Sequence, residues 1–458
     1  KANTTGAQNV AVGNNALEDC TTAANMTAVG YWALAQATTG GNNTALGFNC
    51  LTNLTTATGN TAVGAYSNDA ASNAGADNTS VGYYSLSANT TGTRNAVLGT
   101  SCLGANTTGN DNIAIGHNTL DANTTGHSNV AVGKDALGAN ITGQDNIAIG
   151  HNALLLATDS SCTAVGAYAL DANTTATQNV AMGAYALSAN TTGIQNVAIG
   201  NNALDANTTA SNNTAVGLAA LGANTTGASG TAVGSSALAS LTTGAKNTAF
   251  GAGAGVDVST ANYNTLVGAE AGENINVGDS NVCVGRVAGD VITTGAYNVC
   301  IGYGTDPSAN SGNNAIVIGY TVTGAGDNRF TFGNGSTDSD IAFGATSITA
   351  PSDIRYKEDI EDGSAGLNFI NDLRPVTFKW KKEKDLPKDH KAYVEGSEKR
   401  TMNNDKINHG FIAQEVKEII DNHPEIKEGF DMWSVDEDGS SDPRQRIGEG
   451  ALIPILTK

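Results

Sequence analysis

The sequence is poor in aromatic residues, in proline and in positive charge. Of its 458 residues, 5% are aromatic, 14% are charged and only 7 are proline. Lysine and arginine number 23 against 43 aspartate and glutamate residues, which gives a net charge of −20. This balance argues against nucleic acid as a partner, because phosphate binding requires clustered basic side chains. The scarcity of large side chains also argues against a set of ordinary globular domains in a chain of this length.

The sequence also lacks several segments that would point to a membrane or a metal. No run of about 20 apolar residues is present, so we expect no membrane insertion. No signal peptide is visible, and Lys1 lies inside a repeat, so we expect a missing N-terminal region that attaches the chain to other proteins. The 6 cysteines form no CxxC pair and no Cys/His cluster. We therefore expect neither a metal nor a cofactor.

What the sequence does contain is a repeat marked by glycine. Nineteen glycines follow one another at an almost constant step, and sixteen of the eighteen steps are 17 residues. A fixed short period over this length indicates a stack of repeats instead of one globular core. These marker glycines are Gly13, Gly30, Gly47, Gly64, Gly82, Gly99, Gly116, Gly133, Gly150, Gly166, Gly183, Gly200, Gly217, Gly234, Gly251, Gly268, Gly285, Gly302 and Gly319.

Each repeat carries the pattern of a short strand before its marker glycine. In Ile113-Ala114-Ile115 a small residue separates two large ones, which is the period of a β-strand. We expect the large pair to line the interior of the coil and the small residue to face a partner chain. Asn stands four residues before the marker glycine in 15 of the 19 repeats, and identical amides one turn apart can form a hydrogen-bonded ladder. The Asn-Thr-Thr-Gly segments read as turns.

The composition divides the chain near Ser352. Residues 1–351 contain 6 basic and 20 acidic residues, whereas residues 352–458 contain 17 and 23. Such a change marks a domain boundary. We predict a mainly β chain with a β-solenoid shaft of about 19 seventeen-residue repeats over 1–320, a transition and capping segment over 321–351, and a small α+β domain over 352–458.

The Asn-x-Ala-Val/Ile-Gly pattern resembles the head repeats of trimeric autotransporter adhesins and repeats of phage tail fibres. The resemblance covers about residues 3–320 and implies a left-handed parallel β-roll in a homotrimer. Oligomerisation also has a physical reason, because one thin solenoid with few bulky residues buries little apolar surface.

Three blocks after Ser352 resemble the endosialidase-type intramolecular chaperone, a self-cleaving C-terminal domain of phage tail spikes and fibres. They are Ser-Asp-x-Arg-x-Lys-x-x-Ile at 352–360, Leu-Arg-Pro-Val-x-Phe-x-Trp at 373–380 and Gly-Phe-Ile-Ala-Gln-Glu-Val at 410–416. The family's following helix is largely absent, so we expect this domain to be C-terminally truncated.

The resemblance implies a Ser/Lys dyad at Ser352 and Lys357, with the Pro351–Ser352 bond as the one that is cut. A serine hydroxyl requires a base to become nucleophilic, and a lysine with a lowered pKa can be that base. We name His409 and Gln414 as candidate supporting residues for the oxyanion. Any enzymatic activity would be a single self-cleavage with no external substrate.

These observations predict a structural and host-adhesion segment of a phage tail fibre, located in the virion and extracellular when it functions. Its expected partners are two further copies of the chain, a glycan or protein receptor on the host surface, and other tail proteins. The alternatives are a bacterial trimeric surface adhesin and a tail spike that degrades polysaccharide. The latter would require paired carboxylates in a groove, and aspartates such as Asp111 and Asp145 are scattered over turns.

Overall fold

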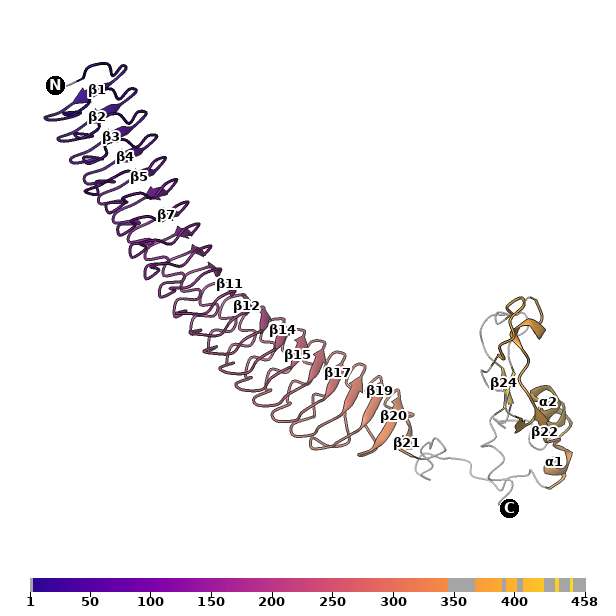
Figure 1. Ribbon diagram of the computed structural model, residues 1–458. Helices are drawn as coiled ribbons and strands as arrows, with labels where there is room; N and C mark the ends of the chain where they lie inside the picture. Colours follow the sequence, from indigo (N-terminus) through magenta and orange to yellow (C-terminus); the bar gives the residue numbers. More distant parts are fainter. Residues whose placement is uncertain are drawn as a thin grey trace. The chain divides into compact units, whose positions relative to one another are not determined.

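The chain forms two compact units, residues 1–351 and 352–458, which are described separately. In the first unit, short coils stack along one axis, as Figure 1 shows. The structure therefore confirms a mainly β chain with a parallel β-solenoid of about 19 turns. The computed structural model describes residues 3–344, 367–388, 393–401, 407–423, 433–435 and 445–447.

Each of the nineteen turns contributes one strand of three or four residues, which ends at or just before the marker glycine. The strands are β1 (Val10–Val12), β2 (Thr27–Val29), β3 (Thr44–Leu46), β4 (Thr61–Val63), β5 (Thr79–Val81), β6 (Ala96–Leu98), β7 (Ile113–Ile115), β8 (Val130–Val132), β9 (Ile147–Ile149), β10 (Thr163–Val165), β11 (Val180–Met182), β12 (Val197–Ile199), β13 (Thr214–Val216), β14 (Thr231–Val233), β15 (Thr248–Phe250), β16 (Thr265–Val267), β17 (Val282–Val284), β18 (Val299–Ile301) and β19 (Ile316–Gly319).

Neighbouring strands pair in parallel and in the register that the repeat predicts. Ile113, for example, lies opposite Val130, and Ile115 lies opposite Val132. After β19 the sheet gains one more parallel strand, β20 (Arg329–Gly333), and then turns back into the antiparallel strand β21 (Ser339–Ala342). This hairpin lies in the segment for which the sequence predicts a cap.

The face of each strand that is buried is the opposite of the one that we expected. From β2 to β19 the second residue of each strand is buried inside the coil: Ala114, Ala148 and Ala198 have no exposed surface. The large residues on either side point outward, and Val12 and Phe250 are 58% and 57% exposed. The prediction that the small residue faces a partner chain is therefore wrong, because this residue is enclosed in the interior of its own coil.

The marker glycines allow successive turns to approach each other closely, as the sequence suggested. Each has a φ between +127° and +150° along this column. An added Cβ would lie within 1.7 to 2.6 Å of the carbonyl oxygen of the glycine one turn ahead. The close backbone approach and the backbone angle each require glycine at this position.

Leucine and asparagine fill the interior on the far side of the coil. Four residues after the marker glycine, Leu120, Leu137 and Leu154 are fully buried although their φ angles are about +50°. The Asn of the Asn-Thr-Thr segments is also buried, as at Asn106 and Asn123. These segments therefore contribute a second interior column, although the sequence predicts only turns for them.

The Asn that precedes each strand forms the predicted ladder along the axis. Asn112 Nδ2 donates to Asn95 Oδ1 over 3.2 Å and to the Gly126 carbonyl over 2.9 Å. Asn112 Oδ1 in turn accepts hydrogen bonds from the backbone and side-chain nitrogens of Asn129, each over 3.1 Å. Wherever this Asn recurs in consecutive turns, a buried amide ties each turn to the next; Met26, Cys162, Gly230 and Ala315 interrupt the ladder.

The second Asn column forms two shorter ladders, and their ends can be recognised from unpaired atoms. Within the described part of the chain, Asn140 Oδ1 and Asn224 Oδ1 are buried without a hydrogen-bond partner. The next turns hold Ala157 and Leu241 at this position, so no amide is present to donate. These acceptors are unpaired because the sequence of the ladder is interrupted there.

We expect Asn112→Ala to destabilise the solenoid by about 3 kcal/mol, because it leaves the Asn129 backbone N–H without an acceptor in the interior and removes the other hydrogen bonds of the Asn112 side chain. Chemical unfolding followed by circular dichroism measures this change. Asn201→Ala is the matched control, because Asn201 is exposed, its side chain forms no hydrogen bond within the described chain, and other turns hold Ala184 or Ala252 at this position. Equal stability of the two variants would contradict a structural role for the buried ladder.

The second unit combines short helices with short antiparallel strand pairs. Helix α1 (Leu367–Asp372) precedes strand β22 (Val376–Phe378), a 3-10 turn follows at Glu383–Asp385, and strand β23 (Asn408–Gly410) leads into helix α2 (Ala413–Asn422). A further antiparallel pair is formed by β24 (Trp433–Val435) and β25 (Gln445–Ile447). Among the described residues, no helix is both long and apolar enough to cross a membrane.

Candidate functional site

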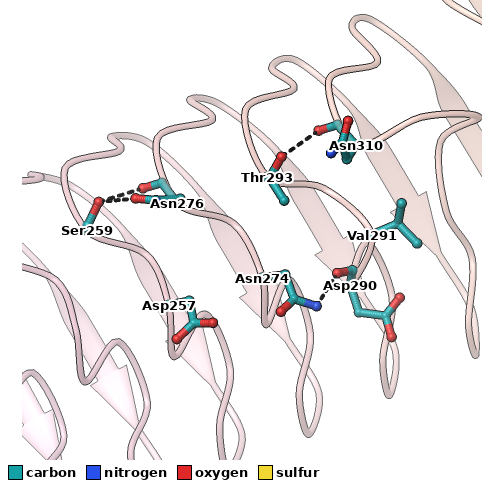
Figure 2. Close-up of a pocket in the computed structure, with 8 residues that line it drawn as sticks. All are labelled: Asp257, Ser259, Asn274, Asn276, Asp290, Val291, Thr293 and Asn310. Carbon is teal, nitrogen blue, oxygen red and sulfur yellow. Dashed lines mark hydrogen bonds between the residues drawn. The ribbon is translucent and has the colours of Figure 1, made fainter.

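A polar groove of about 730 Å³ lies on the solenoid, in the turns that follow β15 to β18. Asp257, Asn274 and Asp290 follow one another along successive turns in Figure 2. A second row runs beside the first. Together the lining residues are Asp257, Ser259, Asn274, Asn276, Asp290, Val291, Thr293 and Asn310.

The groove forms where the repeat sequence changes. In the middle of the solenoid this stretch reads Ala-Asn-Thr-Thr, and the Asn points inward. In the groove turns the inward residues are Val258, Ile275 and Ile292, all fully buried. Aliphatic side chains thus fill the coil interior beneath this stretch. The residues on either side of them line the groove, and all of these except Val291 carry an acid, an amide or a hydroxyl.

Hydrogen bonds between turns hold several groove side chains in place. Ser259 Oγ donates to the Asn276 carbonyl over 3.1 Å and also contacts Asn276 Oδ1. Thr293 Oγ1 donates to the Asn310 carbonyl over 3.4 Å. Asn274 Nδ2 donates to the Asp290 carbonyl over 2.7 Å, as Figure 2 shows. The groove walls are therefore fixed before any ligand arrives.

The groove is acidic. None of the eight lining residues is basic, and two of them are aspartates. Next to it, Asp306 Oδ1 accepts a hydrogen bond from the Val291 backbone nitrogen over 3.3 Å. Burial, with a smaller contribution from neighbouring Asp290, raises the pKa of Asp306 to about 6. A negatively charged ligand would therefore be repelled by the aspartates of this region.

The groove is not built as a metal site. Within the described ranges, no three His, Cys, Asp or Glu side chains come together in a way that could hold a metal ion. The acidic and amide groups are instead spread along the axis, one turn after another. Such an arrangement can offer hydrogen bonds to an extended ligand.

In the second unit, the second and third sequence blocks lie together. Strand β22 pairs with β23, so that Thr377 lies opposite His409. The Arg374 guanidinium forms an ion pair with Glu415 on α2, with Nε 2.9 Å from Oε2. Phe369 and Val416, which are both buried, lie in the interior of this unit.

The structure describes only part of the predicted cleavage site. Ser352, Lys357 and the scissile residue Pro351 lie outside the described residues. His409 and Gln414 are both exposed, and within the described part neither side chain forms a hydrogen bond. Their role beside an oxyanion therefore stays a prediction.

The comparisons with known proteins agree with the C-terminal resemblance. A family described as chaperone of endosialidase matches residues 352–423. No curated protein and no solved structure matches the chain. An endosialidase-chaperone domain that follows a long β-solenoid fits a tail-fibre-like protein with a role in trimer assembly.

Sequence reasoning missed the groove, although a signal was present. The Asn-Thr-Thr consensus stops after Thr226, and aliphatic residues take the place of the inward Asn from Leu241 onward. Consecutive turns that depart from the repeat consensus indicate a candidate binding site, because their residues are not set by the stacking of the turns alone.

Proposed function

We propose that this chain is a segment of a homotrimeric phage tail fibre, with the solenoid as a stiff shaft and residues 352–458 as its assembly domain. The observation that carries the proposal is the match to the endosialidase chaperone at 352–423, C-terminal to a 19-turn solenoid and its closing hairpin. In the virion, the shaft would present a receptor-binding surface to the host cell.

An apolar strip along the solenoid supports the homotrimer. The residue just before the marker glycine is Val, Leu, Ile, Met or Phe in all nineteen turns, and it points outward. Examples are Leu98, Ile149 and Phe250, which are all exposed in the single chain. A long exposed apolar surface is typical of an interface. Because the strip repeats at the same step in every copy, copies in register complement one another.

A separate assembly domain would prevent chains with such a strip from associating out of register. Turns that look alike can pair one turn out of register, and long-range β pairing is slow to form. A separate C-terminal domain that first brings three chains together fixes both their number and their register. This is the role that we assign to residues 352–458.

Self-cleavage would then separate the assembly domain from the finished fibre. Neutral Lys357 takes the proton of Ser352, whose Oγ attacks the carbonyl carbon of Pro351. The peptide C–N bond breaks as the ester forms, and Lys357 passes the proton to the leaving nitrogen, which becomes the free amine of Ser352. Water then hydrolyses the ester, which leaves a carboxylate on Pro351 and restores the serine hydroxyl.

We expect wild-type protein to yield a product that ends at Pro351, whereas Ser352→Ala stays at the full mass of 46.2 kDa. Intact-mass spectrometry of both purified proteins makes the comparison. Ser364→Ala is the matched control, because it removes a serine from the same segment and should be cleaved like wild type. Full-length mass in all three proteins would refute self-cleavage.

A further inference from the structure

We propose that the groove after β15 to β18 binds an uncharged oligosaccharide that lies along the solenoid axis. This inference rests on the proposed host-attachment function and gives the chemical class of the receptor. The groove's place, its free polar groups and its charge each support it.

The groove would stay open in the proposed trimer. Its lining residues all come from the segments between strands, and none belongs to the apolar strip. Asp257 and Val291 are both exposed in the single chain. Association of three copies through the strip therefore leaves this part of each coil available to a ligand.

The free polar groups of the groove suit hydroxyl groups. In the described chain, the Asp257 carboxylate and the Asn310 side-chain amide form no hydrogen bond with other residues, and Asn274 uses only its Nδ2. The hydrogens of Ser259 and Thr293 are already donated to the neighbouring turn, which leaves their oxygens as acceptors. Carboxylate, hydroxyl and carbonyl oxygens thus outnumber free donors, and sugar hydroxyls supply the missing donors.

The spacing and the apolar content of the groove suit a chain of sugar rings. Groups in one column recur at the strand spacing of about 4.8 Å, which is close to the length of one pyranose unit. Val291, 43% exposed, provides an apolar contact for the C–H face of a ring. A polymer can therefore meet one polar side chain of the second row on each successive turn, namely Ser259, Asn276, Thr293 and Asn310.

The charge of the groove selects against acidic sugars. No lining residue is basic, Asp257 and Asp290 are acidic, and Asp306 lies beside them. A sialic acid or a sulfated sugar would bring a carboxylate or sulfate close to these aspartates without a positive partner. The acceptor-rich surface instead favours neutral or N-acetylated sugars.

The test is binding of the full chain to an array of immobilised neutral, N-acetylated, sialylated and sulfated oligosaccharides. We expect wild type to bind neutral or N-acetylated members. Asp257→Ala/Asn276→Ala should weaken this binding at least about tenfold, because two hydrogen-bonding groups are lost. The control Asp205→Ala/Asn201→Ala removes one carboxylate and one amide from turns outside the groove and should bind like wild type.

Several results would overturn the inference while leaving the fibre proposal intact. They are unchanged binding by the groove variant, preference for acidic sugars, or no binding to any oligosaccharide on the array. Thermal unfolding and native mass of both variants show whether they fold and assemble as wild type does. The fibre proposal is judged separately, by the cleavage and association of the wild-type chain.

Discussion

Gly99→Ala should destabilise the solenoid by more than about 4 kcal/mol, because two unfavourable effects add at this position. The φ of Gly99 is +139°, in a region that side chains rarely adopt. A Cβ there would also lie 1.7 Å from the Gly116 carbonyl oxygen and 2.9 Å from Cys102 Sγ. The oxygen belongs to the backbone of the next turn, so relief of the clash requires the two turns to separate.

The effect of this substitution should spread beyond its own turn. In a stack of repeats each turn is stabilised mainly by its neighbours. A break at Gly99 therefore exposes the interiors of two turns, which limited proteolysis followed by mass spectrometry locates. Thermal unfolding by circular dichroism measures the loss of stability.

Gly104→Ala, in the same turn, is the matched control. A Cβ on Gly104 would lie 3.4 Å from its nearest neighbour, the Ser101 carbonyl oxygen, and other turns hold Asp121 or Ala239 at this position. We expect the free energy of unfolding to change by less than about 1 kcal/mol. It rises if alanine mainly reduces the conformational freedom of the unfolded chain. Equal effects of the two substitutions would show that the marker glycines are not required for close stacking.

The period and the main ladder could be predicted from the sequence because each depends on residues at a fixed step. Glycine every 17 residues set the coil length, and Asn112 with its equivalents predicted an amide ladder that the structure contains. The parallel pairing followed from the same register. Handedness and trimer state rest on the resemblance and stay predictions.

The sequence did not show which side of each strand faces inward. Alternation such as Ile113-Ala114-Ile115 separates two faces, but it does not say which one is buried. We assigned the larger residues to the interior, as in a globular core. In this coil Leu120 and the Asn columns already fill much of the interior, and the position beneath the strand is alanine in most turns.

The candidate sites were only partly predictable, for two different reasons. The second and third motif blocks of the C-terminal unit lie in contact, for example through Arg374 and Glu415. They do so because both blocks contribute buried residues to the same small hydrophobic interior. The groove depends instead on several turns that each deviate from the consensus. Asp257, Asn274 and Asp290 look unrelated in the sequence and form a row only after the coils stack.

The outward direction of the large strand residues changes the expected trimer interface. Ile115 and Ile199 lie on the strip, and each is 38% exposed in the single chain. Three copies that meet along this strip would cover these residues and remove them from water. A charged side chain at the same position would then lie in an apolar interface without a partner, which is costly.

We therefore expect Ile115→Asp/Ile199→Asp to prevent stable trimers, while the wild-type chain associates in threes. The control is Ile141→Asp/Ile194→Asp, because these isoleucines are 49% and 38% exposed but lie in turns away from the strip. Both variants carry the same two substitutions and the same added charge, so only the position differs. Sedimentation or light scattering on the uncleaved Ser352→Ala background gives the mass of each species. A monomeric wild type, or trimers of equal stability in both variants, would contradict the strip as the contact between copies.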